Sequence, residues 1–302
     1  MRIGVALREP SGPDPMGRLR EQVAAAAGDG FASAWLSNIF GVDALTALAV
    51  AGHGVDGIEL GTAVVPTYPR HPAALAQQAL TASAALDGRL VLGIGTSHKV
   101  VIEDMYGYDY SQPIRHMREY LAVLLPLLDR QPADVTGTTV SAHIGLSTGG
   151  QGRVPVLLAA LGPQMLRLAG EQAEGTILWM TGPATVRDHI VPAITAAASA
   201  AGRPAPRVVC LLPVCVTDDP GAARERAARV FQGYGTLPSY RAMLDREGVD
   251  GPGDLAIVGD EETVGGQIRA LAGAGVTDFV AGEYARGEDA VRTRALLRSL
   301  LP

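Results

Sequence analysis

The sequence predicts an α/β fold, a single (β/α)8 TIM barrel with insertion segments. Short apolar runs alternate with longer Ala- and Leu-rich segments of helical character about eight times along the 302 residues. The apolar runs are nearly continuous rather than alternating, as expected for parallel strands buried on both faces. An open, doubly wound sheet also fits the alternation, but about eight units in a chain of this length favour the closed barrel.

Each expected strand is a short apolar run bounded by turn residues. The eight expected strands are residues 2–7, 33–37, 58–65, 90–95, 154–160, 175–180, 207–216 and 277–282. Pro213 removes a backbone donor inside the seventh run, so we expect a bulge or an early strand end there.

The expected helices follow the strands, and several begin at a proline, which is tolerated in the first helical turn. Asp43 is a suitable N-cap for the helix after the second strand. The other expected helices are 16–28, 72–85, a helix from about 113, helices from 163 and 183, 220 to about 246, 261–273 and one ending at 300. Residues 131–153 are rich in Thr and Gly and suit a small hairpin. We therefore expect one domain, residues 1–302, with insertions near 100–150 and 233–256.

Composition excludes several classes of partner. Charged residues make up 19% of the chain and the formal net charge is −6, so the sequence predicts neither nucleic-acid nor membrane binding. The amino-terminal segment lacks the apolar core of a signal peptide, and no apolar run approaches about 18 residues, so we expect a cytoplasmic protein. Cys210 and Cys215 fall on opposite faces of one strand, which predicts free thiols. The six histidines show no metal-ligand spacing, so no metal is expected.

The stretch LVLGIGTSHK, residues 90–99, fails two glycine motifs. His98 stands where a dinucleotide fingerprint needs its third glycine, and the hydroxyls of Thr96 and Ser97 are out of step with a nucleophile elbow. Its position still matters, because Thr96, Ser97 and His98 follow a strand at the rim where barrels bind ligands. A turn that merely caps the next helix is the alternative.

Two adjacent loops carry a glycine and a proline at a helix start. Gly162 and Pro163 follow the fifth strand, and Thr181, Gly182 and a proline follow the sixth. Free N–H groups at two helix starts suit a phosphate-bearing ligand. The alternative is that both Gly-Pro pairs only end a loop and begin a helix, without binding a ligand.

The pocket is expected to draw on apolar and aromatic side chains at the same rim. The candidates are Phe40, Tyr68, Tyr106 and Trp179, beside His98. Such a pocket suits a small, planar or apolar substrate.

Four stretches together resemble the bacterial luciferase-like oxidoreductase superfamily, in its coenzyme F420-dependent branch. The strongest match is GTAVVPTYPRHPAALAQQALTASAALDGRLVLGIGTSH, residues 61–98, and residues 154–182, 214–227 and 255–280 also match. The resemblance covers essentially the whole chain. It implies a (β/α)8 barrel, assembled as a homodimer or larger oligomer, with a flavin or deazaflavin across its carboxyl-terminal mouth.

The resemblance also implies positions for the coenzyme. A non-proline cis peptide supporting the ring falls at Ala63–Val64, and the glycines of 90–95 would let the strand pass close under that ring. Ring contacts fall on Thr96, Ser97 and His98, and phosphate or tail contacts on Gly162, Pro163, Thr181 and Gly182. Many deazaflavin enzymes have Asp-His after the second strand, where this chain has Ser37 and Asn38. That departure alters the ring contact and any proton transfer at this point.

The implied reaction is hydride transfer between C5 of the deazaflavin F420 and a small organic substrate, with the protein supplying position, water exclusion and a proton donor. His98 is the candidate donor or substrate-orienting group, with coenzyme contact as the alternative role. Two rival functions stay open. One is an FMN-dependent monooxygenase using O2 and a partner reductase; the other is a non-redox, aldolase-like protein relying on Lys99, the only lysine of the chain.

Overall fold

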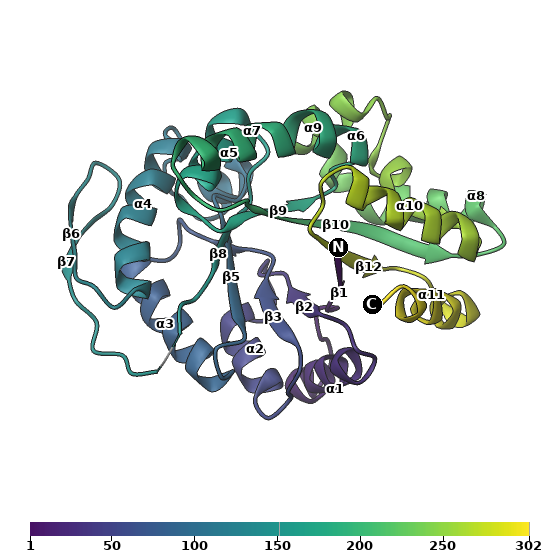
Figure 1. Ribbon diagram of the computed structural model, residues 1–302, viewed down its shortest axis with the longest axis horizontal. Helices are drawn as coiled ribbons and strands as arrows, with labels where there is room; N and C mark the ends of the chain where they lie inside the picture. Colours follow the sequence, from purple (N-terminus) through teal and green to yellow (C-terminus); the bar gives the residue numbers. More distant parts are fainter. Residues whose placement is uncertain (151, 302) are drawn as a thin grey trace.

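The computed structural model describes residues 1–150 and 152–301, and eight parallel strands in it close into a barrel. β1 pairs with both β2 and β12, and β9 pairs with β10, so the ring of strands has no open edge. The barrel strands are β1 (Arg2–Ala6), β2 (Ser33–Leu36), β3 (Glu59–Thr62), β5 (Leu90–Gly95), β8 (Val156–Leu158), β9 (Gly175–Trp179), β10 (Arg207–Val216) and β12 (Asp278–Glu283). The predicted fold class is confirmed, and Figure 1 shows the helices arranged around this barrel.

The helices follow the strands in the predicted alternation. Most carry a proline in the first turn, where no N–H is needed. The side chains of Asp14, Asp43, Asp219 and Asp260 cap four helices, two of which also begin with a proline. The helices are α1 (Pro15–Gly28), α2 (Ala44–Gly52), α3 (Pro72–Ala85), α4 (Pro113–Leu128), α5 (Pro163–Gln172), α6 (Pro183–Thr185), α7 (Val191–Ala200), α8 (Pro220–Phe231), α9 (Pro238–Glu247), α10 (Glu261–Gly273) and α11 (Gly287–Ser299).

Two apolar layers hold the barrel together. The larger one lies between the strands and the surrounding helices, and a smaller cluster that includes Val91, Leu157 and Val209 fills the barrel interior around Trp35. Gly61 makes room for this tryptophan, because a Cβ there would lie 2.3 Å from its ring. The interior is therefore a packed core, and any ligand must bind above it.

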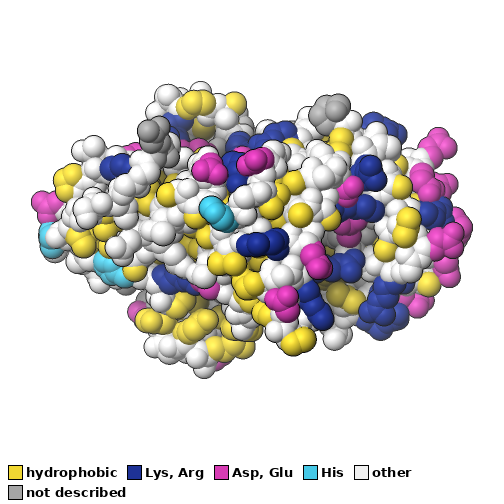
Figure 2. Space-filling view, turned by 90° about the horizontal axis from the view of Figure 1, so that it is seen from below, with side chains coloured by type: hydrophobic (Ala, Val, Ile, Leu, Met, Phe, Trp, Pro, Cys, Tyr) yellow, Lys and Arg dark blue, Asp and Glu magenta, His cyan; other side chains and the backbone are white. Residues whose placement is uncertain are grey.

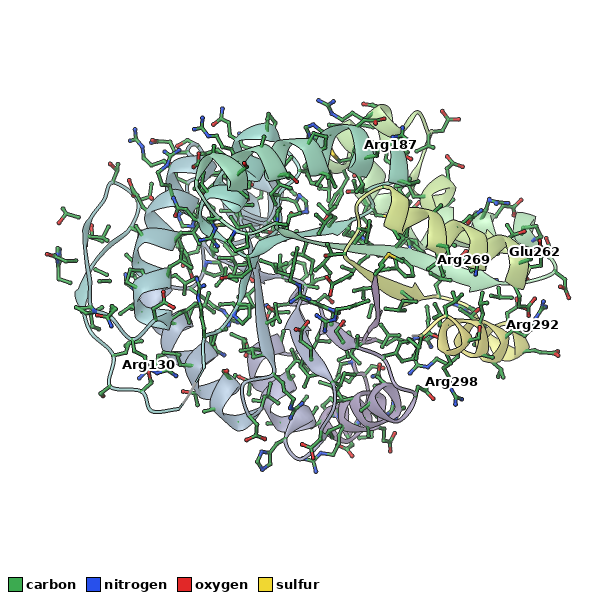
Figure 3. All side chains as sticks on the ribbon, in the orientation of Figure 1. Arg130, Arg187, Glu262, Arg269, Arg292 and Arg298 are labelled. Carbon is green, nitrogen blue, oxygen red and sulfur yellow. The ribbon has the colours of Figure 1, made fainter. Side chains whose placement is uncertain are left out.

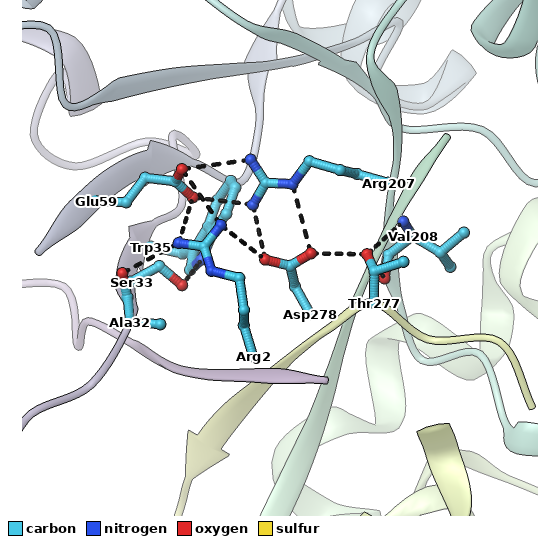
Figure 4. A network of polar contacts seen from close by, with 9 residues as sticks. All are labelled: Arg2, Ala32, Ser33, Trp35, Glu59, Arg207, Val208, Thr277 and Asp278. Carbon is cyan, nitrogen blue, oxygen red and sulfur yellow. Dashed lines mark hydrogen bonds and ion pairs between the residues drawn. The ribbon is translucent and has the colours of Figure 1, made fainter. Parts of the chain in front are cut away.

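An ion-pair network closes the amino-terminal floor of the barrel (Figure 4). The guanidinium of Arg207 lies 2.9 Å from Glu59 and 2.7 Å from Asp278, and Arg2 pairs with the same two carboxylates at 3.4 and 3.2 Å. The network links β1, β3, β10 and β12. It leaves the opposite, carboxyl-terminal end as the open mouth.

The first insertion contains a π-helical segment and the expected hairpin. The π-helical segment is Val100–Met105, and strands β6 (Ala133–Thr136) and β7 (Ser141–Ile144) pair in antiparallel fashion. Figure 1 shows this hairpin projecting beyond α4 at the edge of the molecule. The carboxylate of Glu119 anchors it by accepting bonds from the backbone N–H groups of Thr139 and Val140.

The second insertion corrects the predicted long helix from 220 to 246. The chain leaves α8 at Phe231, passes through a 3-10 turn at Gln232–Thr236, and resumes as α9 at Pro238. Pro238 has no N–H to continue a helix from α8, so the helix must restart there. A second 3-10 turn, Pro252–Leu255, leads to the short strand β11 (Ile257–Gly259), which pairs with β10.

The strand end expected at Pro213 is also wrong, because β10 continues through it to Val216. β10 pairs with β9 up to Leu211 and with β11 from Val214. On this edge of β10, Pro213 lies in the gap between the two partners, while on the other edge it is in register with Gly282 of β12. Its missing N–H therefore removes no ladder bond to β9 or β11, and the strand runs on without a break.

The surface carries mixed charges. Figure 2 shows acidic and basic side chains side by side toward the end of the molecule that carries α8 and α10. Among the helices of the described residues, none combines the length and the apolar character needed to cross a membrane.

Candidate active site

A cavity of about 960 Å³ opens at the carboxyl-terminal mouth of the barrel. Its floor is formed by Val64, Ala159 and Ile177, which rise from the apolar barrel interior. Three segments surround it: the loop after β5, the start of α5, and the stretch from Thr236 to Tyr240 in the second insertion. The cavity is large enough for a ligand of cofactor size.

The loop after β5 places Thr96, Ser97 and His98 at this cavity, as predicted. Ser97 adopts a left-handed backbone conformation, with φ of 60°, which a non-glycine residue rarely takes. The hydroxyl of Tyr110 holds the loop in this shape, because it donates to the Ser97 carbonyl and bonds the Thr96 hydroxyl, each at 2.9 Å. The loop is thus fixed from one side and faces the cavity from the other.

Burial decides the protonation of His98. Removal from water lowers the pKa of its imidazole, since burial disfavours the charged form. The ring is therefore neutral near pH 7, with one nitrogen as a donor and the other as an acceptor.

The two glycines of β5 are required for packing against neighbouring strands, whereas the prediction was that they let β5 pass close under a ring. A Cβ at Gly93 would lie 2.0 Å from the carbonyl oxygen of Thr62, so the glycine makes room for strand β3. The Thr62 hydroxyl bridges the same strands by donating to the Gly93 carbonyl and accepting from its N–H. A Cβ at Gly95 would lie 3.0 Å from Val64 and from Ala159. Space at both glycines is thus taken by protein, although Gly95 also borders the cavity.

The start of α5 meets the cavity with free backbone donors. Gly162, Pro163, Gln164 and Met165 line the cavity, and no side chain among the described residues caps this helix. The uncapped N–H groups and the positive end of the helix dipole together suit an anionic group. The phosphate contact at Gly162 and Pro163 stays a prediction, and the uncapped helix start beside the cavity is the observation that supports it.

At the second predicted phosphate loop, the backbone N–H groups already bind a carboxylate of the protein. The carboxylate of Glu247, at the end of α9, accepts from the N–H groups of Ala184 at 3.0 Å and Thr185 at 2.7 Å. Gly182 lies against this carboxylate, and Thr181 is buried with its hydroxyl donating to the Trp179 carbonyl. An internal anion thus takes the place expected for a phosphate, which argues against the contacts predicted for Thr181 and Gly182.

The residues predicted beside the ring are only partly brought together. The peptide bond Ala63–Val64 is cis, at the predicted position, and Val64 borders the cavity. Ser37, Asn38 and Ala63 do not line it. The side-chain oxygen of Asn38 instead accepts from the Ala44 N–H at 2.9 Å and so positions the start of α2.

Of the four predicted pocket side chains, only Trp179 lines the cavity. Phe40 and Tyr106 lie at the surface, with exposed fractions of 63% and 42%. Tyr68 stacks on His116 behind the 96–98 loop rather than facing the cavity. An aromatic residue type indicates that a side chain packs against others, but it does not predict the direction in which the ring points.

Three residues of this site have structural roles that the sequence did not reveal. Tyr110 supports the 96–98 loop, Tyr240 borders the cavity opposite His98, and Glu247 anchors the helix that carries Tyr240. Tyr240 and Glu247 come from the second insertion. The sequence predicted the position of this insertion but no role for it. No local signal distinguishes them, because tertiary packing alone brings them to the mouth.

Among the described residues no group of acidic, histidine or cysteine side chains has the arrangement of a metal site. Lys99 is also unsuited to covalent chemistry, because its side chain is 72% exposed and pairs with Glu103 at 3.6 Å. A lysine that forms a covalent bond with substrate is usually enclosed in an apolar pocket, and Lys99 is not. The aldolase-like alternative therefore has no support in this geometry.

The chain is a (β/α)8 barrel with a cavity above the carboxyl ends of its strands. A model of the family described as luciferase-like monooxygenase matches residues 1–278. The chain belongs to this family, which confirms the family predicted from residues 61–98.

Individual relatives are similar over most of their length. The chain is 28% identical over 267 residues to a 5,10-methylenetetrahydromethanopterin reductase of Methanolobus tindarius, covering 88% of this chain and 81% of the relative. It superposes with a TM-score of 0.79 on a coenzyme F420-dependent tetrahydromethanopterin reductase from Methanopyrus kandleri, at 23% identity, covering 99% and 98% of the two chains. An F420-dependent secondary alcohol dehydrogenase with an F420-acetone adduct gives a TM-score of 0.81 at 21% identity, covering 100% and 98%. Both superpositions show the same barrel fold.

Proposed function

We propose that this protein is an F420-dependent oxidoreductase that transfers a hydride between the coenzyme and a small, planar or apolar organic substrate. The observation that carries the proposal is one cavity in which an uncapped helix start and a half-buried histidine, His98, face the same space. The relatives named as F420-dependent enzymes support the choice of coenzyme.

The residues at the mouth fit the coenzyme. The backbone N–H groups at the start of α5, after Gly162 and Pro163, would hold its phosphate. Thr96 and Ser97 would contact the ring from the rim, and Val64 would lie against its face. When bound, F420 supplies a hydride donor or acceptor at C5 of its deazaflavin. Ser37, Asn38 and Ala63 do not line the cavity, so no coenzyme contact is proposed for them.

The substrate side of the cavity is mainly apolar. Ile177 and Trp179 come from β9, and Leu237, Pro238 and Tyr240 come from the second insertion. Such a wall excludes water from the reacting atoms and favours planar or hydrophobic groups. It supports a substrate that carries a reducible double bond, a carbonyl group or an alcohol.

We propose His98 as the residue that gives a proton to the substrate or takes one from it. Its neutral imidazole lies in the cavity and titrates below its ordinary range. His98→Gln keeps hydrogen-bonding atoms but cannot exchange a proton near neutral pH. If His98 moves the proton, this variant lowers kcat and keeps the Kd for F420; if His98 holds the coenzyme, the Kd rises instead.

The test of the function is a titration of the purified apoprotein with F420 and, separately, with FMN, followed by fluorescence quenching. We expect F420 to bind with a Kd of about 1 μM or tighter and FMN to bind far more weakly. Tight binding of FMN without a response to F420 would replace the proposal with the flavin-dependent monooxygenase. Binding of neither compound would contradict both redox functions.

We also propose that the chain assembles as a homodimer or larger oligomer. The exposed apolar side chains of Phe40 and Met105, 63% and 60% exposed, are two candidate positions for such an interface. Light scattering coupled to size exclusion measures the mass directly. A mass equal to one chain of 31.3 kDa would contradict the assembly.

A further inference from the structure

The second insertion supplies an aromatic wall that faces His98. Tyr240, in the first turn of α9, lies with its ring centroid 5.4 Å from that of His98 and with the planes inclined by 48°. Tyr234 meets Tyr240 edge-on at 5.3 Å and Trp179 edge-on at 5.7 Å. This packing continues from the second insertion to β9. His98 is thus covered on one side by a ring from a segment about 140 residues away in the sequence.

One face of α9 is attached to the barrel at three points. Tyr240, Met243 and Glu247 are spaced by three and four residues, which places them on the same side of the helix. Tyr240 meets His98, the Met243 carbonyl accepts from the Thr185 hydroxyl at 3.3 Å, and Glu247 accepts from two backbone N–H groups. The rigid helix therefore couples its last residue to its first turn, about 10 Å away.

The attachment at Glu247 is closely fitted. Its carboxylate binds at the start of α6, where the free N–H groups and the helix dipole favour a negative charge. A Cβ at Gly182 would lie 2.2 Å from the carboxyl carbon, so this glycine makes the approach possible. Arg187 lies on the outer surface of the same region (Figure 3), and its charge is favourable to the carboxylate.

We propose that Tyr240 is a positioning residue for His98, and that Glu247 keeps Tyr240 in contact with His98 by anchoring α9 to α6. The importance of His98 rests on the proposed function, whereas the contact itself needs no coenzyme. Glu247 touches neither the cavity nor His98, so its effect on the imidazole must pass through α9. Tyr240 shields one face of the ring and limits its orientations toward the cavity.

Titration of His98 reports this contact in the apoprotein. Burial lowers its pKa, and Tyr240 contributes to that burial. Besides His98 and Tyr240, the titratable groups along the cavity are Lys99, Glu103, Asp104 and Tyr110, all on the segment that carries His98. None of these four lies on α9, so a change at Tyr240 alters the shielding of His98 and leaves their charges in place.

The experiment is an NMR titration of the histidine side chains, with the His98 signal assigned from its absence in His98→Gln. We expect Tyr240→Ala to move the His98 midpoint to higher pH, and Tyr240→Phe to leave it unchanged. Glu247→Ala should move the midpoint in the same direction as Tyr240→Ala. The double variant Tyr240→Ala/Glu247→Ala should shift it no further than Tyr240→Ala alone, because both changes act through one contact.

Asp245→Ala is the matched control, because this residue of α9 is exposed and pairs with Arg241 of the same helix at 2.7 Å. It should leave the His98 midpoint unchanged. Glu247→Gln, which keeps one acceptor oxygen, covers the case in which Glu247→Ala fails to fold, and should give a smaller shift in the same direction. An unchanged midpoint in the folded Glu247 variants overturns the proposal. A shift in a protein that does not bind F420 supports the positioning role and contradicts only the proposed function.

Discussion

The imidazole of His116 stacks on the phenol ring of Tyr68, with the ring centroids 3.9 Å apart and the planes inclined by 13°. The Nε2 atom of His116 bonds the buried hydroxyl of Thr67 at 3.0 Å. Burial lowers the pKa of His116 from 6.5 to about 4, with the nearby Glu119 opposing this only in part. The histidine behind the 96–98 loop is therefore neutral in the folded protein at neutral pH.

This stacking predicts a loss of stability in mild acid. The unfolded chain protonates His116 below about pH 6.5, whereas the folded protein resists until about pH 4. The free energy of unfolding is unaffected above pH 6.5 and falls by about 1.4 kcal/mol per pH unit between these values, to a total of about 3 kcal/mol. Urea denaturation of the wild type and of His116→Gln at about pH 7.5 and about pH 5 measures how much His116 contributes to the change in the free energy of unfolding.

His116→Gln keeps a nitrogen donor for Thr67 but cannot titrate, so its stability should fall less between the two pH values. His53→Gln, at an exposed position, is the control and should follow the wild type. Equal pH dependence of all three proteins would contradict the assignment of the effect to His116.

The ion-pair network at the barrel floor predicts a large effect of one arginine. Arg207 joins Glu59 and Asp278, and the side chain of Asp278 is only 3% exposed. Arg207→Ala should lower the free energy of unfolding by about 3 kcal/mol, because it leaves a buried carboxylate with Arg2 as its remaining cation. Urea denaturation at neutral pH measures the loss.

Arg187→Ala is the matched control for the floor. Its side chain is 60% exposed and pairs with the neighbouring Asp188, so its loss should leave the free energy of unfolding close to that of the wild type. Similar losses in the free energy of unfolding for Arg207→Ala and Arg187→Ala would show that the floor network contributes no more to stability than an exposed ion pair.

The barrel was predictable because its signals are local. The run 90–95 contains no charged or polar side chain, as expected for a strand buried on both faces, and it forms β5 over those residues. Pro72 and Pro163 similarly begin helices where they stand in the sequence. Strand ends also place Thr96, Ser97 and His98 at the mouth, since every βα loop of a barrel opens at the same end.

The errors arose where tertiary packing decides. Pro213 lies between two successive strand partners, and no local pattern shows that gap. Gly182 looked like a phosphate contact because its loop repeats the pattern at Gly162, yet Glu247, 65 residues later, occupies the helix start. The direction of Phe40 was equally hidden, because residue type does not show which side of a loop faces the cavity.

Close packing of β3 against β5 predicts opposite effects of one methyl group at two glycines. A Cβ at Gly93 would lie 2.0 Å from the Thr62 carbonyl oxygen, so Gly93→Ala should cost about 3 kcal/mol or more in stability. A Cβ at Gly266, in α10, has no neighbour within 4 Å. Gly266→Ala should instead stabilise the protein by about 0.5–1 kcal/mol, because alanine favours the helix. Thermal denaturation of both variants tests the pair, and a tolerated Gly93→Ala would contradict the strand packing.

The hydroxyl of Tyr110 gives the last prediction, which joins stability to coenzyme binding. Tyr110→Phe keeps the ring but removes the bonds to the Thr96 hydroxyl and the Ser97 carbonyl. We expect a loss of about 1–2 kcal/mol in stability, and a rise of about tenfold in the Kd for F420, because Ser97 then leaves its left-handed conformation more easily.

Tyr108→Phe is the control for this variant, because its ring belongs to the same insertion but is 45% exposed. Neither its stability nor its Kd for F420 should change measurably. Fluorescence quenching gives the Kd, and urea denaturation gives the stability, for both variants beside the wild type. A Tyr110→Phe protein that loses stability but keeps the wild-type Kd would show that the hydroxyl supports the fold alone. The affinity for the coenzyme would then not depend on the conformation of the 96–98 loop. The ring contacts would have to come from the strands on the other side of Val64.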